Sequence, residues 1–145
     1  MTSSRYVQIV VLGLTGILLA GCDNDAASYQ IDGREHAVTL LRQQPYFWSK
    51  KTELAVVIAR LPDCQRRHPL KPAVDGDPRA ELFEHAPGQL LLRRGTEWYA
   101  LETQNCVLQA VAAPQGSASA RPLGAFDKTA GKLRFIAAST VPKPR

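Results

Sequence analysis

The first 22 residues constrain this chain more than any other stretch. An uncharged, mostly apolar run extends from Tyr6 to Leu19, preceded by a single charge at Arg5. At about 14 residues, the run is shorter than the roughly 20 that a helix needs to cross the hydrocarbon of a bilayer. A short charged start, an apolar middle and small residues at the end are typical of a secretory signal. We therefore expect residues 1–21 to form a signal helix that is removed during export.

The apolar run ends in Leu19-Ala20-Gly21-Cys22, where a cysteine directly follows two small residues. This stretch resembles the lipobox of bacterial lipoprotein precursors, and the resemblance covers residues 1–24. It implies that the Cys22 thiol receives a diacylglycerol, that the signal is cut before Cys22, and that the new amine is acylated, as by palmitate. Two or three chains give stable attachment, because each buried methylene contributes about 0.8 kcal/mol. The alternative is a plain signal peptide with a chance cysteine.

The residue after the cysteine bears on location. In Gram-negative lipoproteins, an aspartate at the position of Asp23 resembles the signal for staying in the inner membrane. The resemblance therefore implies a protein held by the lipid on Cys22 at the periplasmic face of the inner membrane. The outer membrane is the alternative location.

The charge balance restricts the partners. The chain has 18 Lys and Arg against 13 Asp and Glu, a net charge of +5. This is below the charge density expected of a dedicated nucleic-acid binder, and export also argues against nucleic acid as a partner. Anionic lipid head groups, cell-wall polymers and an acidic envelope protein remain as candidate partners.

The mature chain is long enough for one domain. Removal of residues 1–21 leaves about 124 residues, which can bury a core of their own. Residues 22–28 are small and polar, and we expect them to form a flexible tether. We expect a single β-rich domain over 29–138 and a disordered tail over 139–145.

The pattern within this domain predicts short strands separated by turns. Asp32-Gly33 is a strong two-residue hairpin turn, which favours a strand from Arg34 to about Arg42, although a helical stripe also fits there. The run Leu54–Leu61, apolar except for Arg60, is typical of a strand buried on both faces. Further strands are expected at 80–85, 89–93, 97–103, 106–111, 123–127 and 132–137.

About eight strands at this spacing predict a mainly β fold, either a small antiparallel β-sandwich or a barrel-like meander. The last two strands form a hairpin around residues 128–131, and Leu133 and Phe135 should face inward. In the pair Trp98-Tyr99, successive side chains must point to opposite faces of a strand, so one is expected in the core and the other on the surface.

Cys64 and Cys106 remain once Cys22 carries lipid. An even pair in an oxidising compartment predicts a disulfide. It would close a loop of about 43 residues and stabilise the fold by about 4 kcal/mol in the chain-entropy account. Two buried free thiols are the alternative. We expect neither a metal nor a cofactor, because there is no CxxC spacing and the nearest histidine is His68.

The proline-rich segment Asp63–Arg79 is expected to be a long loop, and loops of that length are often functional. Positive charge is concentrated in it at Arg66, Arg67, His68 and Lys71. Arginine is suited to bidentate contacts with phosphate or carboxylate, so this group is a candidate contact surface for an anionic partner. The alternative is an ordinary solvated loop.

A second candidate is the aromatic cluster Tyr46-Phe47-Trp48. Adjacent aromatic rings can form a stacking platform for a sugar or a peptide, and Tyr46 and Trp48 are the candidate contact residues. Aromatic clusters more often lie in the core, because each ring buries a large apolar area. The sequence favours this core interpretation.

No constellation for catalysis is visible. The three histidines share no HxH or HxxxH spacing, and no serine lies in a G-x-S-x-G context. We therefore predict a lipid-anchored envelope protein that is not an enzyme and acts as a binding or accessory module. A small lipoprotein inhibitor of an envelope-directed enzyme, similar in outline to β-barrel lysozyme inhibitors, is the alternative, and a hydrolase comes third.

Overall fold

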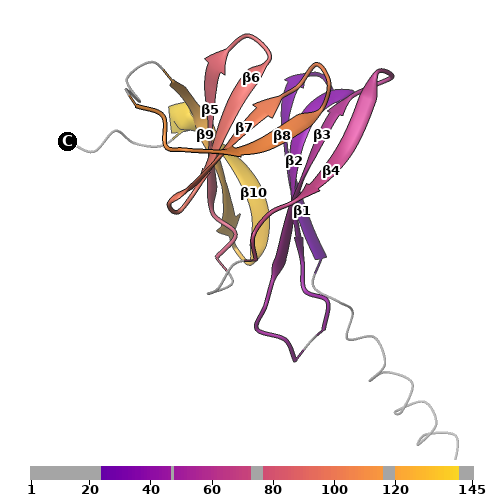
Figure 1. Ribbon diagram of the computed structural model, residues 1–145. Coiled ribbons are helices and arrows are strands. Elements are labelled where there is room, and N and C mark those ends of the chain that lie inside the picture. The colour runs from indigo at the N-terminus through magenta and orange to yellow at the C-terminus, as the bar shows by residue number, and fades with distance from the viewer. Residues whose placement is uncertain (1–23, 47, 73–76, 116–119, 141–145) are drawn as a thin grey trace, which may run out of the picture.

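The computed structural model describes residues 24–46, 48–72, 77–115 and 120–140 (Figure 1). The predicted signal, the acylation site at Cys22 and the ring of Phe47 lie outside the described residues. Among the residues that the structure describes, no helix has the length and apolar character needed to cross a bilayer.

The described chain folds into two antiparallel sheets, which confirms the predicted mainly β fold. The smaller sheet has the order β1-β2-β3-β4, and its strands are β1 (Asn24–Asp32), β2 (His36–Gln43), β3 (Glu53–Arg60) and β4 (Cys64–Pro69). The larger sheet has the order β10-β9-β5-β6-β7-β8. Its strands are β5 (Ala80–Ala86), β6 (Gln89–Arg94), β7 (Glu97–Glu102), β8 (Val107–Val111), β9 (Arg121–Thr129) and β10 (Lys132–Ala137), followed by the short 3-10 helix η3 (Ala138–Thr140).

Alternating side chains from the two sheets form a single core between them. The smaller sheet turns inward Val38, Leu40, Val56 and Ile58, and the larger sheet turns inward Leu82, Leu92, Leu101 and Phe126. As expected, Leu133 is buried, and Phe135 packs inward with its ring centroid 5.0 Å from that of Phe126. Of the neighbouring pair in β7, Tyr99 is buried and Trp98 lies on the opposite face.

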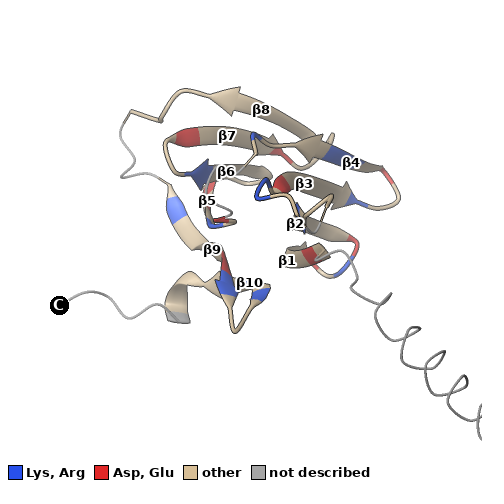
Figure 2. Cartoon of the chain, turned by 90° about the horizontal axis from the view of Figure 1, so that it is seen from below, with Lys and Arg blue, Asp and Glu red and all other residues tan. Residues whose placement is uncertain are grey.

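The two sheets approach each other along both edges, which gives the fold a barrel-like outline (Figure 2). Along one edge β1 packs against β10, where the Asp25 carboxylate accepts the backbone amide of Leu133 at 2.8 Å. Along the other edge, that of β4 and β8, the disulfide joins Cys64, the first residue of β4, to Cys106, which directly precedes β8. The strand ladders themselves stay in two separate sheets within the described residues.

Four expectations about local structure need correction. The segment 63–79 is not one loop, because β4 pairs with β3 and completes the edge of the smaller sheet. The expected tether over 22–28 is largely strand: β1 begins at Asn24 and its residues pair with β2. The last hairpin has a tighter turn, because Thr129 already pairs with Lys132. At the end of the chain, 138–140 form η3, and the rest of the expected tail lies outside the described residues.

Candidate binding surface

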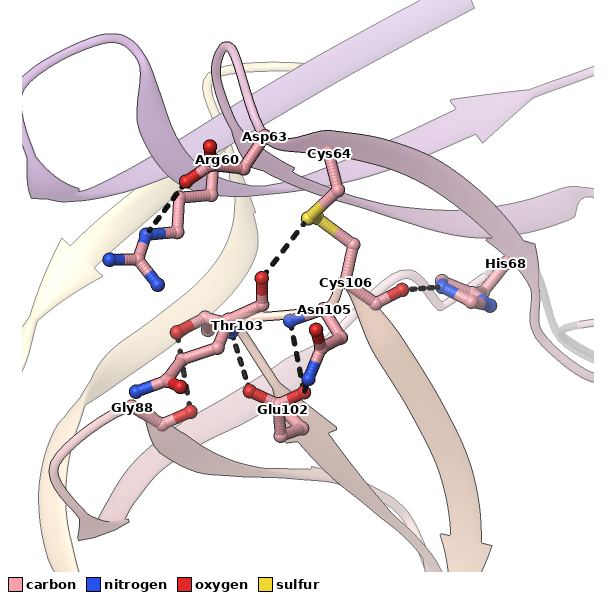
Figure 3. The surroundings of a disulfide bond; sticks show 10 residues. Arg60, Asp63, Cys64, His68, Gly88, Glu102, Thr103, Asn105 and Cys106 are labelled. Atoms are coloured by element: carbon pink, nitrogen blue, oxygen red, sulfur yellow. Dashed lines mark hydrogen bonds and ion pairs between the residues drawn. A yellow bond between two sulfur atoms is a disulfide. The ribbon is translucent and has the colours of Figure 1, made fainter.

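The predicted pair Cys64 and Cys106 is a disulfide, with 6.1 Å between the two Cα atoms (Figure 3). Cys64 is the first residue of β4, and Cys106 ends the four-residue turn between β7 and β8. Cys106 has a positive φ of 57°, and its side chain reaches Cys64 in β4. The disulfide therefore fixes this turn, and with it the start of β8, to the smaller sheet.

Glu102 organises the same turn from its other side. Its carboxylate accepts the backbone amides of Gln104 at 2.6 Å and Asn105 at 3.0 Å, and also the side-chain amide of Asn105 at 3.0 Å. Desolvation alone would raise the pKa of Glu102, but the hydrogen bonds from Gln104 and Asn105, which favour the charged form, outweigh it. The pKa of Glu102 is therefore lowered from its ordinary value.

His68, one of the predicted contact residues, makes a hydrogen bond within the domain. Its Nε2 lies 2.8 Å from the backbone carbonyl oxygen of Cys106, and the side chain is half-buried. Because a carbonyl oxygen can only accept, His68 donates this hydrogen bond from a protonated Nε2. His68 thus joins β4 to the disulfide-bonded turn.

The three basic residues beside His68 do not converge on one site. Arg66 and Arg67 are neighbours in β4, so they point to opposite faces of the sheet, and both are exposed. Arg67 donates to the side-chain oxygen of Gln43 at 2.7 Å. Lys71 lies beyond the strand and pairs with Glu97 at 2.9 Å. The hydrogen bond to Glu97, together with its negative charge, raises the pKa of Lys71.

The core interpretation of the aromatic cluster is wrong for both of its described members. Tyr46 and Trp48 lie in the connection between β2 and β3, with 56% and 68% of their surface exposed. Their rings stack with centroids 5.1 Å apart and an interplanar angle of 17°. They form a stacked pair on the surface, and a role as a platform for a sugar or a peptide stays a prediction.

A hollow lies elsewhere, on the outer face of the larger sheet. It has a volume of about 380 Å³ and is lined by His85, Gln89, Leu90, Leu91, Ala100, Leu101, Glu102, Val107 and Gln109. The strand register places Leu91, Ala100 and Gln109 in one row across β6, β7 and β8, and Gln89, Glu102 and Val107 in the next. The methyl side chain of Ala100 between two longer side chains leaves the hollow. We call these residues the outer-face hollow.

An aromatic and ionic cluster continues the same face toward the other end of the strands. The Arg93 guanidinium carbon lies 5.7 Å from the ring centroid of Phe83 and 5.6 Å from that of Trp98. Arg93 also donates from Nε to the Glu81 carboxylate at 2.6 Å. A smaller hollow of about 230 Å³ lies here, lined by Asp77, Arg79, Glu81, Arg93 and Gly95. The outer face thus combines an apolar floor with fixed polar groups.

One feature of the sequence could have indicated this apolar outer face, namely the three consecutive leucines of β6. Leu90, Leu91 and Leu92 are all buried, although successive side chains of a strand point to opposite faces. A run of three leucines therefore predicts apolar character on both faces of β6. Trp98 and Ala100, two residues apart in β7, extend the outward apolar set.

Comparisons with protein-family models, with curated protein sequences and with solved structures find no match to this chain. Within the described residues, no group of three His, Cys, Asp or Glu side chains is arranged to hold a metal ion. The functional argument therefore depends on the surface geometry and on the N-terminal sequence.

Proposed function

We propose that this chain is a lipid-anchored binding module of the bacterial envelope that holds a protein partner on the outer-face hollow and is not itself an enzyme. Its proposed place is the periplasmic face of the inner membrane, through acylation of Cys22. The observation that carries the proposal is the hollow, which has the features of a small recognition site: an apolar floor and a few fixed polar groups.

The chemistry of the hollow favours a polypeptide as the ligand. Its floor, made by Leu91 and Ala100, suits an apolar side chain. The side-chain amides of Gln89 and Gln109 each offer a donor and an acceptor, as backbone groups of a bound segment require. Beside the hollow, on the same face, Arg93 lies against the rings of Phe83 and Trp98 and pairs with Glu81, so this neighbouring cluster adds polar groups whose positions are already fixed.

The test fills the hollow without changing charge. In Ala100→Trp, an indole would occupy the space above the floor, and capture of the partner should fall. The matched control is Ala26→Trp, because Ala26 is exposed in β1 of the other sheet. A photo-crosslinking residue at Gln109 in the full chain reports the partner from intact membranes, and thermal unfolding checks that both variants are folded.

The two variants should differ clearly in the crosslink formed at Gln109. Loss of the Gln109 crosslink in Ala100→Trp, and its retention in Ala26→Trp, would support the proposal. Equal crosslinking in both variants would exclude the hollow as the binding site. A captured lysozyme would assign the inhibitor role in place of the accessory role.

A further inference from the structure

The lysines of the described chain are gathered at one end of the molecule. This basal end is where β1 begins: Asn24 pairs with Gln43 at the end of β2, and Gln43 pairs with Glu53 at the start of β3. The hydrogen bond from Leu133 to Asp25 brings the β9–β10 turn to the same end. All five lysines in the described residues are exposed there: Lys50, Lys51, Lys71, Lys128 and Lys132.

The stacked aromatic pair lies at this end too. Figure 1 shows the β2–β3 connection projecting beyond the start of β1. Its backbone is held by two hydrogen bonds: Ser49 N donates to the Tyr46 carbonyl at 3.0 Å, and Gln44 Nε2 donates to the Ser49 carbonyl at 2.8 Å. Tyr46 and Trp48 are therefore presented by a folded connection, with Lys50 and Lys51 directly after them.

The position of the proposed anchor makes this end face the membrane. One residue separates Cys22 from Asn24, the first residue of β1. A chain spans at most about 3.6 Å per residue, so the start of β1 lies within about 7 Å of Cys22. If Cys22 carries lipid, the basal end cannot move far from the head groups, and the disulfide-bonded turn is at the opposite end of the strands.

We propose that the basal end docks onto the anionic surface of the bilayer that holds the anchor, with Tyr46 and Trp48 in the head-group layer. This inference rests on the proposed lipid anchor. Aromatic rings with a polar atom favour the membrane interface, and lysines near it are attracted to anionic lipid. Docking fixes the orientation of the domain, so that the strands lead away from the membrane and the outer-face hollow, near the disulfide end, is presented to the periplasm.

Acidic side chains at the basal end offset only part of this attraction, the exposed Glu53 at the start of β3 among them. Glu97 pairs with Lys71, and Asp127 pairs with Arg79. Asp25 is engaged by the Leu133 amide. Within the described residues, the four lysines 50, 51, 128 and 132 take part in no ion pair, so their charges remain available to phosphate groups.

The test measures where Trp48 lies in the lipidated protein. The chain has two tryptophans, so Trp98→Phe leaves Trp48 as the single reporter. The full precursor is expressed, extracted as the lipoprotein and reconstituted into vesicles whose lipids carry bromine near the head group. In phosphatidylglycerol vesicles the fluorescence of Trp48 should be quenched, and less so in phosphatidylcholine alone or at high salt. In Trp48→Phe, the remaining Trp98, the second residue of β7, should be quenched less than Trp48, because its ring lies on the sheet face and not on the β2–β3 connection.

Charge variants identify the docking residues. Lys50→Gln with Lys51→Gln should lower the ratio of docked to undocked protein by about tenfold or more. The matched control is Arg66→Gln with Arg67→Gln, which removes the same charge from the middle of β4 and should leave the quenching unchanged. Loss of quenching in the arginine pair alone would overturn the proposal and assign the membrane contact to β4.

Failure of docking can be told apart from failure of the anchor. Mass spectrometry of the Cys22 fragment and flotation with the vesicles report the anchor independently of Trp48. An acylated chain that floats with unquenched Trp48 in phosphatidylglycerol overturns docking and leaves the anchor standing. A chain without acyl mass that does not float overturns both.

Discussion

Gly124 in β9 shows how a missing side chain decides the packing between two strands. Its φ is +155°, and an added Cβ would meet the backbone oxygen of Ile136 and lie 2.6 Å from Cζ of Phe135. Phe135 in turn lies against both Phe126 and Tyr29, with ring centroids 5.0 and 4.9 Å away. The space left by Gly124 therefore lets Phe135 join β10 to β1 across the edge between the sheets.

We predict that Gly124→Ala destabilises the fold by about 1–3 kcal/mol, because the extra methyl group forces Phe135 and the backbone of β10 to shift. Gly131→Ala is the control: Gly131 also has a positive φ, of 78°, but no atom lies within 4 Å of an added Cβ there. Urea unfolding followed by circular dichroism compares the two variants. Equal midpoints for both would show that Phe135 is not constrained by Gly124.

At the scale of elements, the turn between β7 and β8 depends on one carboxylate. Glu102 accepts the amides of Gln104 and Asn105, and its pKa is lowered as a result. A carboxyl group with a lowered folded-state pKa stabilises the fold above its unfolded-state pKa, and this contribution is lost as pH falls through the folded-state value. The turn that presents Cys106 should therefore weaken in acid.

We predict that Glu102→Gln lowers the free energy of unfolding by about 1 kcal/mol at neutral pH, and that the difference from the parent protein vanishes as Glu102 becomes protonated. The measurement is urea unfolding across a pH series from neutral to acidic. Glu53→Gln is the control, because Glu53 is exposed and accepts no hydrogen bond within the described residues. A difference that stays constant down to acidic pH would contradict the assignment.

The elements themselves were predictable to different degrees. The run Leu54–Leu61 marks β3, because burial is a local signal. Asp32-Gly33 marks a hairpin turn in the right place, but this turn covers three residues, 33–35, and not two, so β2 begins at His36 and not at Arg34. β4 could not be predicted, because an edge strand with one paired side needs no apolar alternation, and charged residues there discourage pairing with other chains. The local sequence also does not show which residues become cross-strand neighbours, such as Leu91 and Ala100, and for this reason the outer-face hollow could not be predicted.

At the scale of the whole molecule, the two edges between the sheets are held together by different sets of contacts. The edge between β1 and β10 uses the Asp25 hydrogen bond and the ring contact between Tyr29 and Phe135. The edge between β4 and β8 uses the disulfide and the hydrogen bond from His68 to the Cys106 carbonyl. The disulfide was predictable from cysteine count and compartment, whereas the position of β9 beside β5 was not, because this pairing joins distant segments.

Because the two edges are held by different contacts, we predict that loss of the disulfide weakens the edge between β4 and β8 more than the edge between β1 and β10. Cys64→Ser with Cys106→Ser should lower the free energy of unfolding by about 4 kcal/mol, because the unfolded chain regains the entropy of a long loop. Hydrogen exchange should quicken first in β4 and β8, whose shared edge also loses the fixed position of the His68 acceptor, and later in β1 and β10. Reduction of the parent protein should reproduce the pattern, while Ala26→Trp, remote from this edge, should not. Uniform acceleration in all strands would contradict this prediction and would mean that the two edges open as one cooperative unit.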